Sequence, residues 1–326
     1  MTDKTSDGRG HVLLCTDTFL DEYGDRLAAA APGIEVVPLD NTGIVAAEDL
    51  ERITVAFMSR DAWPDRAKSF IGTVSQATAL DWFHVMSAGV DGPVFEELLG
   101  RNVRVTRSAG ASARAMAETT FMFLHGLSRD LRGAPERYAE RSFAWHRWRE
   151  LEGRRIAVLG YGPVGQRVVE LAMAYGMLPT VVRRQVRGDE PCPARPLLDL
   201  EDVAATHDVI VVALPHNAET DGVVSRAVID RMRQSTLFVN IARGALVDQP
   251  ALTDALVSGR LGGAGLDVFA VEPLPDDDPL WDLPNVLITP HNSGSSHGSP
   301  KIVVEIFFEN LRLYLAGARM HHEVPD

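Results

Sequence analysis

The sequence predicts an α/β protein of two domains, each built on a parallel β-sheet. Its 326 residues are enough for about two domains, each with its own core. Short runs of β-branched residues alternate with helical patterns along the chain, which is typical of parallel sheets. One such run, at residues 156–159, leads directly into a glycine-rich turn and begins a second alternation after the first.

The composition is that of a globular α/β protein, and it excludes several classes of partner. The chain is 45% hydrophobic and 24% charged, with a formal net charge of −13. An acidic surface does not attract nucleic acid or an anionic membrane, so we expect neither as a partner. Cys15 and Cys192 are too few for a disulfide framework or a cysteine-based zinc site. The apolar stretch at 12–15 is too short for a signal peptide or a membrane span, so we expect a cytoplasmic protein.

The first alternation is expected to form one sheet, followed by a long helix. Its strands are predicted at residues 12–15, 34–38, 55–58, 82–86 and 103–106. An alanine-rich stretch with apolar residues at helical spacing predicts one helix over 112–131. The arginine-rich segment that follows, up to residue 152, carries Trp145 and Trp148, and tryptophans in a charged segment suit an interface.

The second alternation is expected to form the second sheet. Its strands are predicted at residues 156–159, 180–182, 209–214, 237–241, 265–268 and 286–289. A helix is expected to begin at Pro163, because proline is favoured at the first helical position and an apolar stripe follows it. The last predicted helix, 300–316, has no strand left to pair with, so we expect it to pack on the first domain.

The glycine-rich turn predicts a dinucleotide site. In the motif 160–165, Gly160 permits a tight turn, Gly162 lets a pyrophosphate approach the backbone, and Gly165 lets the helix meet the strand. The free N–H groups at the start of the helix, and its dipole, favour an anion. A Gly-x-Gly-x-x-Gly motif alone is a weak signal, but a strand before it and an amphipathic helix after it make it a strong one.

The end of the next strand predicts which nucleotide is preferred. A carboxylate usually binds the ribose 2′-hydroxyl there, but residues 181–185 contain no acid. Guanidinium groups bind a 2′-phosphate, so Arg183 and Arg184 predict a preference for NADPH over NADH. The alternative is that both arginines are solvated surface residues.

Three residues predict a catalytic group. Arg243, Glu272 and His291 each follow a predicted strand of the second sheet. Doubly wound sheets bind their ligands at the carboxyl ends of the strands, so we expect the three side chains to meet there. A single histidine is more often structural than catalytic, but an arginine, a carboxylate and a histidine on successive strand ends rarely coincide by accident.

These motifs resemble those of the D-2-hydroxyacid dehydrogenase family over nearly the whole chain. Segment 87–91 is similar to the family's substrate loop, Ala117-Glu118 to the helix that crosses between its domains, and segment 145–148 to its dimerisation arm. The resemblance implies a split, flavodoxin-like substrate domain at 1–112 and 292–326 and a central Rossmann cofactor domain at 113–291. It also implies a dimerisation arm near 125–152 and a homodimer.

The resemblance further implies NADP or NAD as cofactor, and it adds predicted contacts to those of the glycine turn. These are Pro163, Val164, Leu214, Pro215, Thr220, Ile241, Ala242 and Asp267. The chain departs from the family pattern at three positions. Arg183 replaces the usual acid, which bears on the choice of cofactor. Thr119 in place of a histidine, and Ser293 in place of an alanine, are expected to matter little.

The implied reaction is hydride transfer between the nicotinamide and a small 2-keto acid or D-2-hydroxy acid. His291 as imidazolium is expected to protonate the carbonyl oxygen near neutral pH, since histidine has a reference pKa of about 6.5. Glu272 would orient the ring, Arg243 would bind the substrate carboxylate, and Asp267 would hold the nicotinamide carboxamide. Substrate contacts are also predicted from backbone N–H groups of Ala88, Gly89 and Val90.

Other features are given no catalytic part. The acidic run 276–278 is expected to be a solvated loop, His321 and His322 an exposed tail, and His216 a neighbour of the cofactor cleft without chemistry of its own. No metal is predicted. Arg60 follows a strand of the first domain, and it is either a contact for a second anionic group of the substrate or solvated surface.

Several functions remain open. We favour a reductase of the glyoxylate or hydroxypyruvate type. Formate dehydrogenase is disfavoured, because its histidine pairs with glutamine. Phosphoglycerate dehydrogenase is disfavoured, because those enzymes usually carry a further domain. A phosphite dehydrogenase and a nucleotide-sensing protein of the corepressor type retain the same three residues and stay as alternatives.

Overall fold

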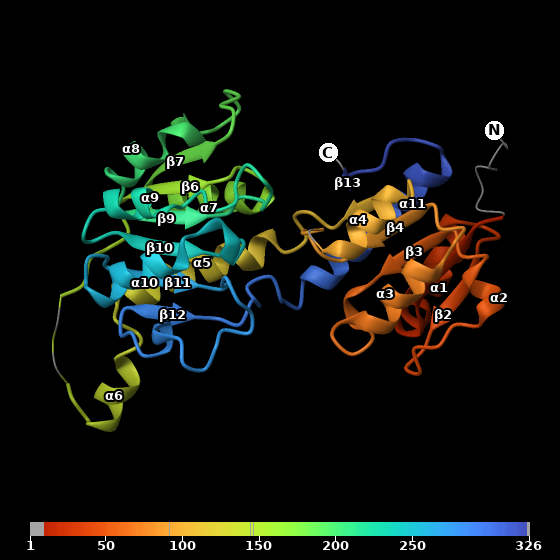
Figure 1. Cartoon of the computed structure of the whole chain (residues 1–326), viewed down its shortest axis with the longest axis horizontal. Helices are drawn as coiled ribbons and strands as arrows, with labels where there is room; N and C mark the ends of the chain where they lie inside the picture. Colours follow the sequence, from red (N-terminus) through yellow and green to blue (C-terminus); the bar gives the residue numbers. More distant parts are fainter. Residues whose placement is uncertain (1–9, 91, 144, 146, 325–326) are drawn as a thin grey trace. The chain divides into compact units, whose positions relative to one another are not determined.

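The computed structural model describes residues 10–90, 92–143, 145 and 147–324. The chain forms two compact units. Unit 1 comprises Met1–Ala111 and His297–Asp326, and unit 2 comprises Ser112–Ser296. Each unit is a sheet with helices packed against it (Figure 1).

Unit 1 has a six-stranded sheet in the order β13-β5-β4-β3-β1-β2, parallel except for β13. Its strands are β1 (Val12–Thr16), β2 (Glu35–Leu39), β3 (Val55–Met58), β4 (Trp82–Val85), β5 (Arg104–Arg107) and β13 (Glu323–Val324). Its helices are α1 (Asp17–Ala30), α2 (Ala47–Leu50), α3 (Ala67–Gln76), α4 (Pro93–Gly100) and α11 (Ser299–Leu315), with a 3₁₀ turn η1 (Arg60–Ala62).

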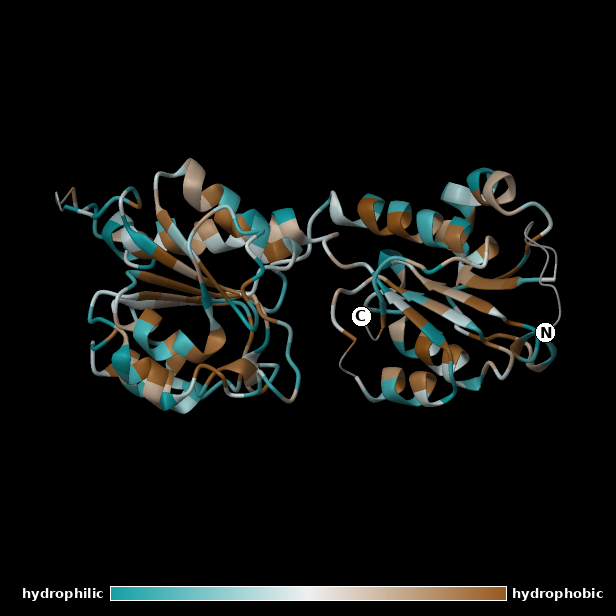
Figure 2. Cartoon of the chain, turned by 90° about the horizontal axis from the view of Figure 1, so that it is seen from above, coloured by the Kyte–Doolittle hydropathy of each residue, from teal (hydrophilic) through white to brown (hydrophobic). Residues whose placement is uncertain are grey.

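Both faces of the unit 1 sheet are covered by apolar cores, so its central strands β1, β3 and β4 are buried along their whole length (Figure 2). On one face α11 packs against the strands, and the rings of Phe57 and Phe307 stack with centroids 4.0 Å apart. Trp82 also stacks on Phe307. The prediction that the last helix packs on the first unit is therefore confirmed. The short strand β13, which follows α11, was not predicted.

Unit 2 has a seven-stranded parallel sheet in the order β12-β11-β10-β9-β6-β7-β8. Its strands are β6 (Arg155–Leu159), β7 (Leu178–Arg183), β8 (Ala194–Pro196), β9 (Val209–Val212), β10 (Leu237–Asn240), β11 (Gly263–Leu266) and β12 (Val286–Ile288). Its helices are α5 (Ala113–Ser128), α6 (Ala134–Ala139), α7 (Pro163–Ala174), α8 (Leu200–Ala204), α9 (Arg226–Arg231) and α10 (Gln249–Val257). Its 3₁₀ turns are η2 (Leu197–Asp199), η3 (Gly244–Leu246) and η4 (Pro279–Trp281).

The strand order of unit 2 creates the place where a doubly wound sheet binds its ligand. Strand β6 lies between β7 and β9, so the strand order reverses at β6 and a ligand-binding crevice is expected at the carboxyl ends of β6 and β9. Helix α5 covers β10–β12 on one face. A Cβ at Gly265 would lie 2.4 Å from the Phe123 ring, so this glycine allows α5 to pack closely.

The units differ in detail from the predicted domains. We expected the cofactor domain to span 113–291, whereas the compact unit also includes Ser112 and residues 292–296. The reason is local bonding, because Ser112 donates to the Gly294 carbonyl at 2.9 Å and the Ser293 N–H donates to Asp267. Strand β11 begins two residues before the predicted 265–268, and β8 was not predicted.

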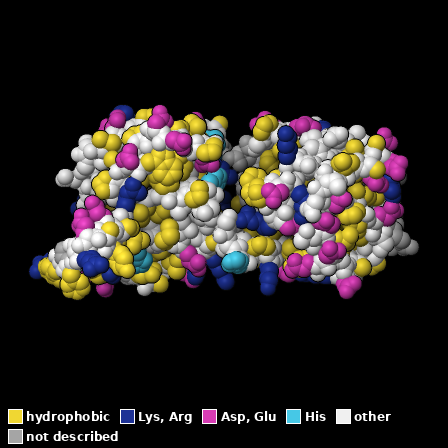
Figure 3. Space-filling view, turned by 90° about the horizontal axis from the view of Figure 1, so that it is seen from below, with side chains coloured by type: hydrophobic (Ala, Val, Ile, Leu, Met, Phe, Trp, Pro, Cys, Tyr) yellow, Lys and Arg dark blue, Asp and Glu magenta, His cyan; other side chains and the backbone are white. Residues whose placement is uncertain are grey.

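The segment predicted as a dimerisation arm extends from the end of α5 and contains α6. Large hydrophobic side chains are exposed along it, namely Leu131, Tyr138, Phe143, Trp145 and Trp148. The Arg129 guanidinium lies 3.3 Å from the centroid of the Trp148 ring. Hydrophobic side chains beside arginines are visible on the surface of this unit (Figure 3). His146, also predicted in the arm, lies outside the described residues.

Candidate active site

The glycine turn that follows β6 has the geometry of a dinucleotide-binding loop. Gly160 has a φ of +102°, and a Cβ there would lie 2.5 Å from the carbonyl oxygen of Ala213, at the end of β9. A Cβ at Gly165 would lie 2.1 Å from the Gly160 carbonyl oxygen. Both positions therefore require glycine for the turn and for the contact between helix and strand.

Gly162 differs, because the described protein around it leaves open space. A Cβ built there meets no atom within 4 Å, so packing within the chain does not explain the glycine. Gly162 is the N-cap of α7 and offers no side chain to its free N–H groups, and Pro163 occupies the first turn. Open space before uncapped N–H groups fits a pyrophosphate, which the helix dipole also favours.

The two arginines predicted at the 2′-position both lie beside carboxylates. Arg183 ends β7, and its Nη1 donates to Asp189 Oδ1 at 2.9 Å and to Glu190 Oε1 at 2.7 Å. Arg184 Nη1 donates to Glu219 Oε2 at 2.7 Å. The Arg183 guanidinium also lies 5.6 Å from the ring of Tyr161, within the glycine motif. These acids are missed when only the strand end is considered, because they come from the loops beyond it.

Glu190 is the anchor of the loop that follows β7. Its side chain is 2% exposed. Its oxygens accept from the backbone N–H groups of Arg187 at 3.2 Å and Gly188 at 2.9 Å, as well as from Arg183. Burial alone would raise the pKa of Glu190, but these backbone and guanidinium hydrogen bonds lower it to about 2. The carboxylate is therefore ionised near neutral pH and holds Arg183 in place.

The other predicted cofactor contacts line the ends of β6, β9 and β10. Pro163 and Pro215 are exposed and Val164 is half-buried. Leu214, Thr220, Ile241 and Ala242 are buried. The Thr220 hydroxyl donates to the Pro215 carbonyl at 2.8 Å and so shapes the loop after β9. Their contact with a cofactor stays a prediction.

The three predicted catalytic residues follow three neighbouring strands of unit 2. Arg243 follows β10, Glu272 follows β11 and His291 follows β12. Because β10 pairs with β11, and β11 with β12, in parallel, all three residues lie at the same edge of the sheet.

His291 and Glu272 are in direct contact. His291 Nδ1 lies 2.7 Å from Glu272 Oε2, and both side chains are partly exposed. The other carboxylate oxygen, Oε1, accepts the N–H of Phe269 at 3.0 Å, which fixes the glutamate. A carboxylate only accepts hydrogen bonds, so Nδ1 is the donor and Nε2 is the ring atom that remains to exchange a proton.

The backbone of His291 is held in an unusual conformation by Asp267. His291 has a φ of +49°, and its N–H donates to the Asp267 carbonyl at 2.8 Å. The buried Asp267 carboxylate accepts from the Thr289 hydroxyl at 2.6 Å and from the Asn292 and Ser293 N–H groups. Asp267 therefore positions the histidine loop, a role that the sequence did not predict. Its contact with a nicotinamide carboxamide stays a prediction.

Two residues that sequence reasoning missed shape the Arg243 loop. Asn240 is buried, and it donates to the Arg243 carbonyl at 2.9 Å and accepts the Ala242 N–H at 3.0 Å. Gly244 lies against the backbone of Phe269, where a Cβ would be 1.9 Å from the carbonyl carbon. The loop that carries Arg243 is thus packed directly on the loop that carries Glu272. An arginine followed by glycine after a strand is the signal that could have indicated this approach.

The predicted substrate residues of unit 1 follow β4 and β3. Ala88, Gly89 and Val90 lie in the loop after β4, where the Ser87 hydroxyl donates to the Gly89 carbonyl at 2.7 Å. Asp91 lies outside the described residues. Arg60 lines a cavity of about 450 Å³ within unit 1, together with Lys301 and His297. The roles of these residues toward a substrate stay predictions.

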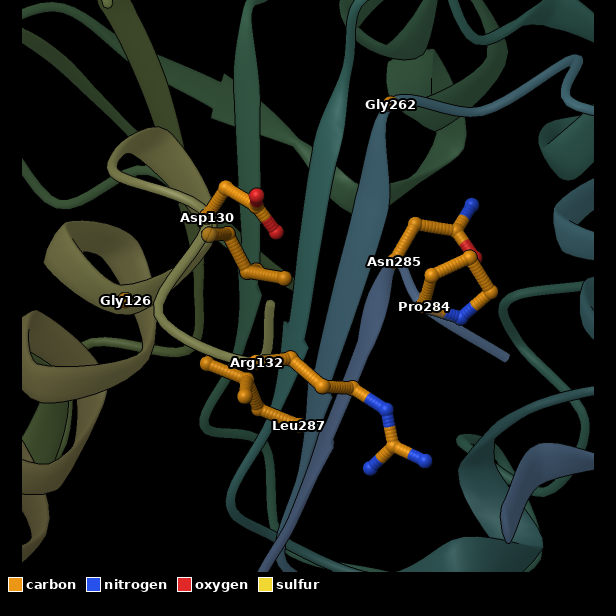
Figure 4. Close-up of a pocket in the computed structure, with 8 residues that line it drawn as sticks. Gly126, Asp130, Arg132, Gly262, Pro284, Asn285 and Leu287 are labelled. Atoms are coloured by element: carbon orange, nitrogen blue, oxygen red, sulfur yellow. The ribbon is translucent and has the colours of Figure 1, made fainter. Parts of the chain in front are cut away.

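The cavity drawn in Figure 4 contains none of the predicted site residues. It has a volume of about 270 Å³ and lies near the end of α5, at the amino-terminal ends of β11 and β12. Asp130, Arg132 and Asn285 are among its lining residues. The predicted catalytic residues Glu272 and His291 follow the opposite ends of these strands. Within the described ranges, no group of three or more His, Cys, Asp or Glu could hold a metal ion.

Comparison with known proteins identifies relatives of this chain. A glyoxylate reductase of Korarchaeum cryptofilum is 32% identical over 245 residues, which are 71% of this chain and 72% of that protein. A D-3-phosphoglycerate dehydrogenase of Mycobacterium tuberculosis is 31% identical over 293 residues, 85% of this chain and 53% of that protein. The chain therefore spans about half the length of that second relative.

Solved structures and a family model agree with these relatives. The D-isomer specific 2-hydroxyacid dehydrogenase from Xanthobacter autotrophicus Py2, solved in complex with NADPH and MES, is 28% identical, with a TM-score of 0.78. The match covers 97% of this chain and 98% of that one. The family model for the D-isomer specific 2-hydroxyacid dehydrogenase NAD binding domain matches residues 121–293. The resemblance inferred from the sequence is confirmed, and the chain belongs to the NAD(P)-dependent D-isomer specific 2-hydroxyacid dehydrogenases.

Proposed function

We propose that this protein reduces a small 2-keto acid, of the glyoxylate or hydroxypyruvate type, to the D-2-hydroxy acid with NADPH or NADH. The observation that carries the proposal is the 2.7 Å contact between His291 Nδ1 and Glu272 Oε2, at the ligand-binding edge of the matched NAD-binding domain. The glyoxylate reductase among the relatives supports the substrate class. The Xanthobacter structure with NADPH supports the cofactor.

His291 would act as the proton donor. Its Nδ1–H is committed to Glu272, so the protonated ring releases its proton from Nε2. A carbonyl oxygen that gains negative charge on reduction needs such a donor within hydrogen-bond reach. The hydrogen bond to the Glu272 carboxylate keeps the His291 ring from rotating.

Arg243 would bind the carboxylate of the substrate. A guanidinium forms charge-assisted contacts with a carboxylate, each worth roughly 1.5–3 kcal/mol. Asn240 and Gly244 fix the Arg243 backbone against the Glu272 loop, so the binding group and the proton donor keep a constant spacing. Ala88, Gly89 and Val90 are proposed to contribute backbone N–H groups from unit 1.

The residues of unit 2 suit a dinucleotide. The glycine turn and the N-terminus of α7 would hold the pyrophosphate, and Arg183 and Arg184 would lie at the 2′-position. A bound nicotinamide supplies the hydride for reduction. The chain's own residues bind the nucleotide, orient the acid and deliver the proton.

A substrate screen tests the proposal. Oxidation of NADPH and of NADH would be followed by absorbance with glyoxylate, hydroxypyruvate, 3-phosphohydroxypyruvate and other small keto acids. A second assay would follow the reduction of NADP⁺ and of NAD⁺ by phosphite. We expect turnover with at least one small 2-keto acid. Cofactor binding without turnover of any of them would contradict the proposal and favour a nucleotide sensor. Reduction of NADP⁺ or NAD⁺ by phosphite, without turnover of any keto acid, would indicate a phosphite dehydrogenase.

We further propose that the protein is a homodimer joined through the segment 129–148. Tyr138, Phe143 and Trp145 present large apolar surfaces there, and such surfaces on soluble proteins mark contact sites. The family resemblance implies that this segment binds a second copy of the chain.

We propose a cytoplasmic location. Its support is that both cysteines are free, one buried in unit 1 and one half-buried in unit 2, which suits a reducing compartment. No helix in the described part of the chain is long and apolar enough to cross a membrane.

A further inference from the structure

Each arginine at the predicted 2′-position already has a carboxylate partner. Arg183 ends β7, and Arg184 and Arg187 lie in the loop that follows it. Three acids, Asp189, Glu190 and Glu219, lie in or against this loop. The guanidinium groups of Arg183 and Arg184 face these three carboxylates, and Arg187 bonds Glu190 through its backbone N–H. The local charge is near zero, although the sequence of this loop suggested a basic site.

The pair between Arg184 and Glu219 connects two loops across the nucleotide crevice. Arg184 follows β7, and Glu219 lies in the loop that follows β9. Strands β7 and β9 are the two neighbours of β6, which ends at the glycine turn. The ion pair thus joins the loops on either side of the strand that carries the dinucleotide motif.

Glu190 and Glu219 hold their arginines in different ways. The Glu190 side chain is buried and also bonds two backbone N–H groups. It therefore cannot move away from Arg183 without breaking the hydrogen bonds that hold the loop. Glu219 has a side chain that is 63% exposed, and Arg184 is 73% exposed. An exposed ion pair is weak, about 0.2–1 kcal/mol, so Glu219 can be displaced at little cost.

We propose that Glu219 is a specificity-determining residue that limits the preference for NADPH. Its carboxylate forms an ion pair with the Arg184 guanidinium, the same group that is predicted to bind the 2′-phosphate. NADPH must displace Glu219 from Arg184, and its 2′-phosphate is then repelled by the released carboxylate. NADH has a hydroxyl at this position and leaves the ion pair intact. This inference rests on the proposed use of NADPH or NADH.

The test is equilibrium binding of NADP⁺ and NAD⁺, measured by calorimetry on the full chain. Glu219→Gln keeps the size of the side chain and removes its charge. We expect the Kd for NADP⁺ to fall about two- to fivefold, as the strength of an exposed pair predicts, while the Kd for NAD⁺ stays unchanged. In an Arg184→Ala background, the same substitution should lose most of its effect on NADP⁺.

Asp221→Asn is the matched control. It removes one negative charge two residues away, where the carboxylate pairs with His216 Nε2 at 2.8 Å and not with an arginine. It should leave the ratio of the two Kd values unchanged. The inference is overturned if Glu219→Gln leaves the NADP⁺ Kd unchanged, changes both cofactors equally, or acts no more strongly than Asp221→Asn. A wild-type protein that binds neither nucleotide would instead contradict the proposed function.

Discussion

At the scale of single residues, the proposed catalytic side chains depend on partners that hold them in place. Glu272 fixes His291 through Nδ1 and is itself fixed by the Phe269 N–H. Asp267 holds the left-handed backbone of His291. A residue in that conformation is strained unless its surroundings determine it, so the hydrogen bonds of Asp267 serve to place the ring.

Replacing His291 with alanine should lower kcat by a factor of about 10²–10⁴, because the proton donor is lost while the nucleotide-binding loop is untouched. Steady-state kinetics would measure the loss, and fluorescence titration with NADPH should give an unchanged Kd. His321→Ala is the control, since its imidazole pairs with the exposed Glu309 of unit 1. Turnover near that of the wild type would remove His291 from the mechanism.

Sequence reasoning places residues at strand ends more readily than it finds their contacts. Arg243, Glu272 and His291 were predicted as catalytic because strand ends converge in a parallel sheet, which is a property of pattern and order. The acids beside Arg183 were missed because loop conformation brings Asp189 and Glu190 back to the strand end. Gly244 and Asn240 act through close packing, which a single sequence does not reveal.

At the scale of helices and strands, burial on both faces made the central strands predictable. Continuous apolar runs such as β3 and β9 are entirely buried and were located within one or two residues. Strands β8 and β13 were missed because three and two residues give no pattern, and β13 depends on pairing with the distant β5. Strand β11 was misplaced because Gly263 and Ala264 lack β-branched character.

Strand β4 contains a buried histidine that should make unit 1 sensitive to acid. His84 Nδ1 lies 2.7 Å from the Thr106 hydroxyl and Nε2 lies 3.0 Å from the Ser108 hydroxyl, and burial lowers the pKa of His84 to about 3. The unfolded chain, with an ordinary histidine, binds this proton at higher pH. Stability from the neutral ring is therefore complete above about pH 6.5 and is lost as the pH falls toward 3.

Between pH 6.5 and 4.5 the wild type should lose roughly 2–3 kcal/mol more unfolding free energy than His84→Gln, which has no ring to protonate. Urea unfolding followed by fluorescence at a series of pH values would measure the slope of unfolding free energy against pH for each protein. Other titrating groups are common to the two proteins and cancel in the difference. Parallel slopes would show that His84 is not the responsive group.

The edge strand β13 should stabilise unit 1 through one ion pair. Arg104 Nε and Nη2 donate to the two Glu323 oxygens at 2.8 and 3.0 Å, and the guanidinium lowers the pKa of Glu323. Glu323→Ala should lower the unfolding free energy by about 1–2 kcal/mol, because the pair is only partly exposed. Asp254→Ala breaks the exposed pair with Arg226 and should cost less than about 0.5 kcal/mol. Equal effects in denaturant unfolding would contradict this.

At the scale of the whole molecule, the chain is two units with separate cores. The sequence predicted two domains because two alternations of strand and helix are each long enough to bury a core. The return of the chain to unit 1 was inferred from the unpartnered last helix, which packs on Phe57 and Trp82 through Phe307. The exact boundary was not predictable, because hydrogen bonds of Ser112 and Ser293 decide it.

The proposed dimer can be tested by light scattering after size-exclusion chromatography. The wild type should have about twice the monomer mass of 35.6 kDa. A Phe143→Ser and Trp145→Ser double variant should shift toward the monomer, since it removes two exposed aromatic contacts. Val257→Ser alters another exposed apolar residue, on α10, and should remain dimeric. A monomeric wild type, or a double variant of unchanged mass, would rule out this interface.

The contact of Gly244 with the Phe269 backbone limits how the protein could be re-engineered. No carbon can be added at 244 without moving main-chain atoms, so this glycine maintains the close approach of the loops after β10 and β11. Laboratory evolution toward larger substrates should leave this glycine untouched.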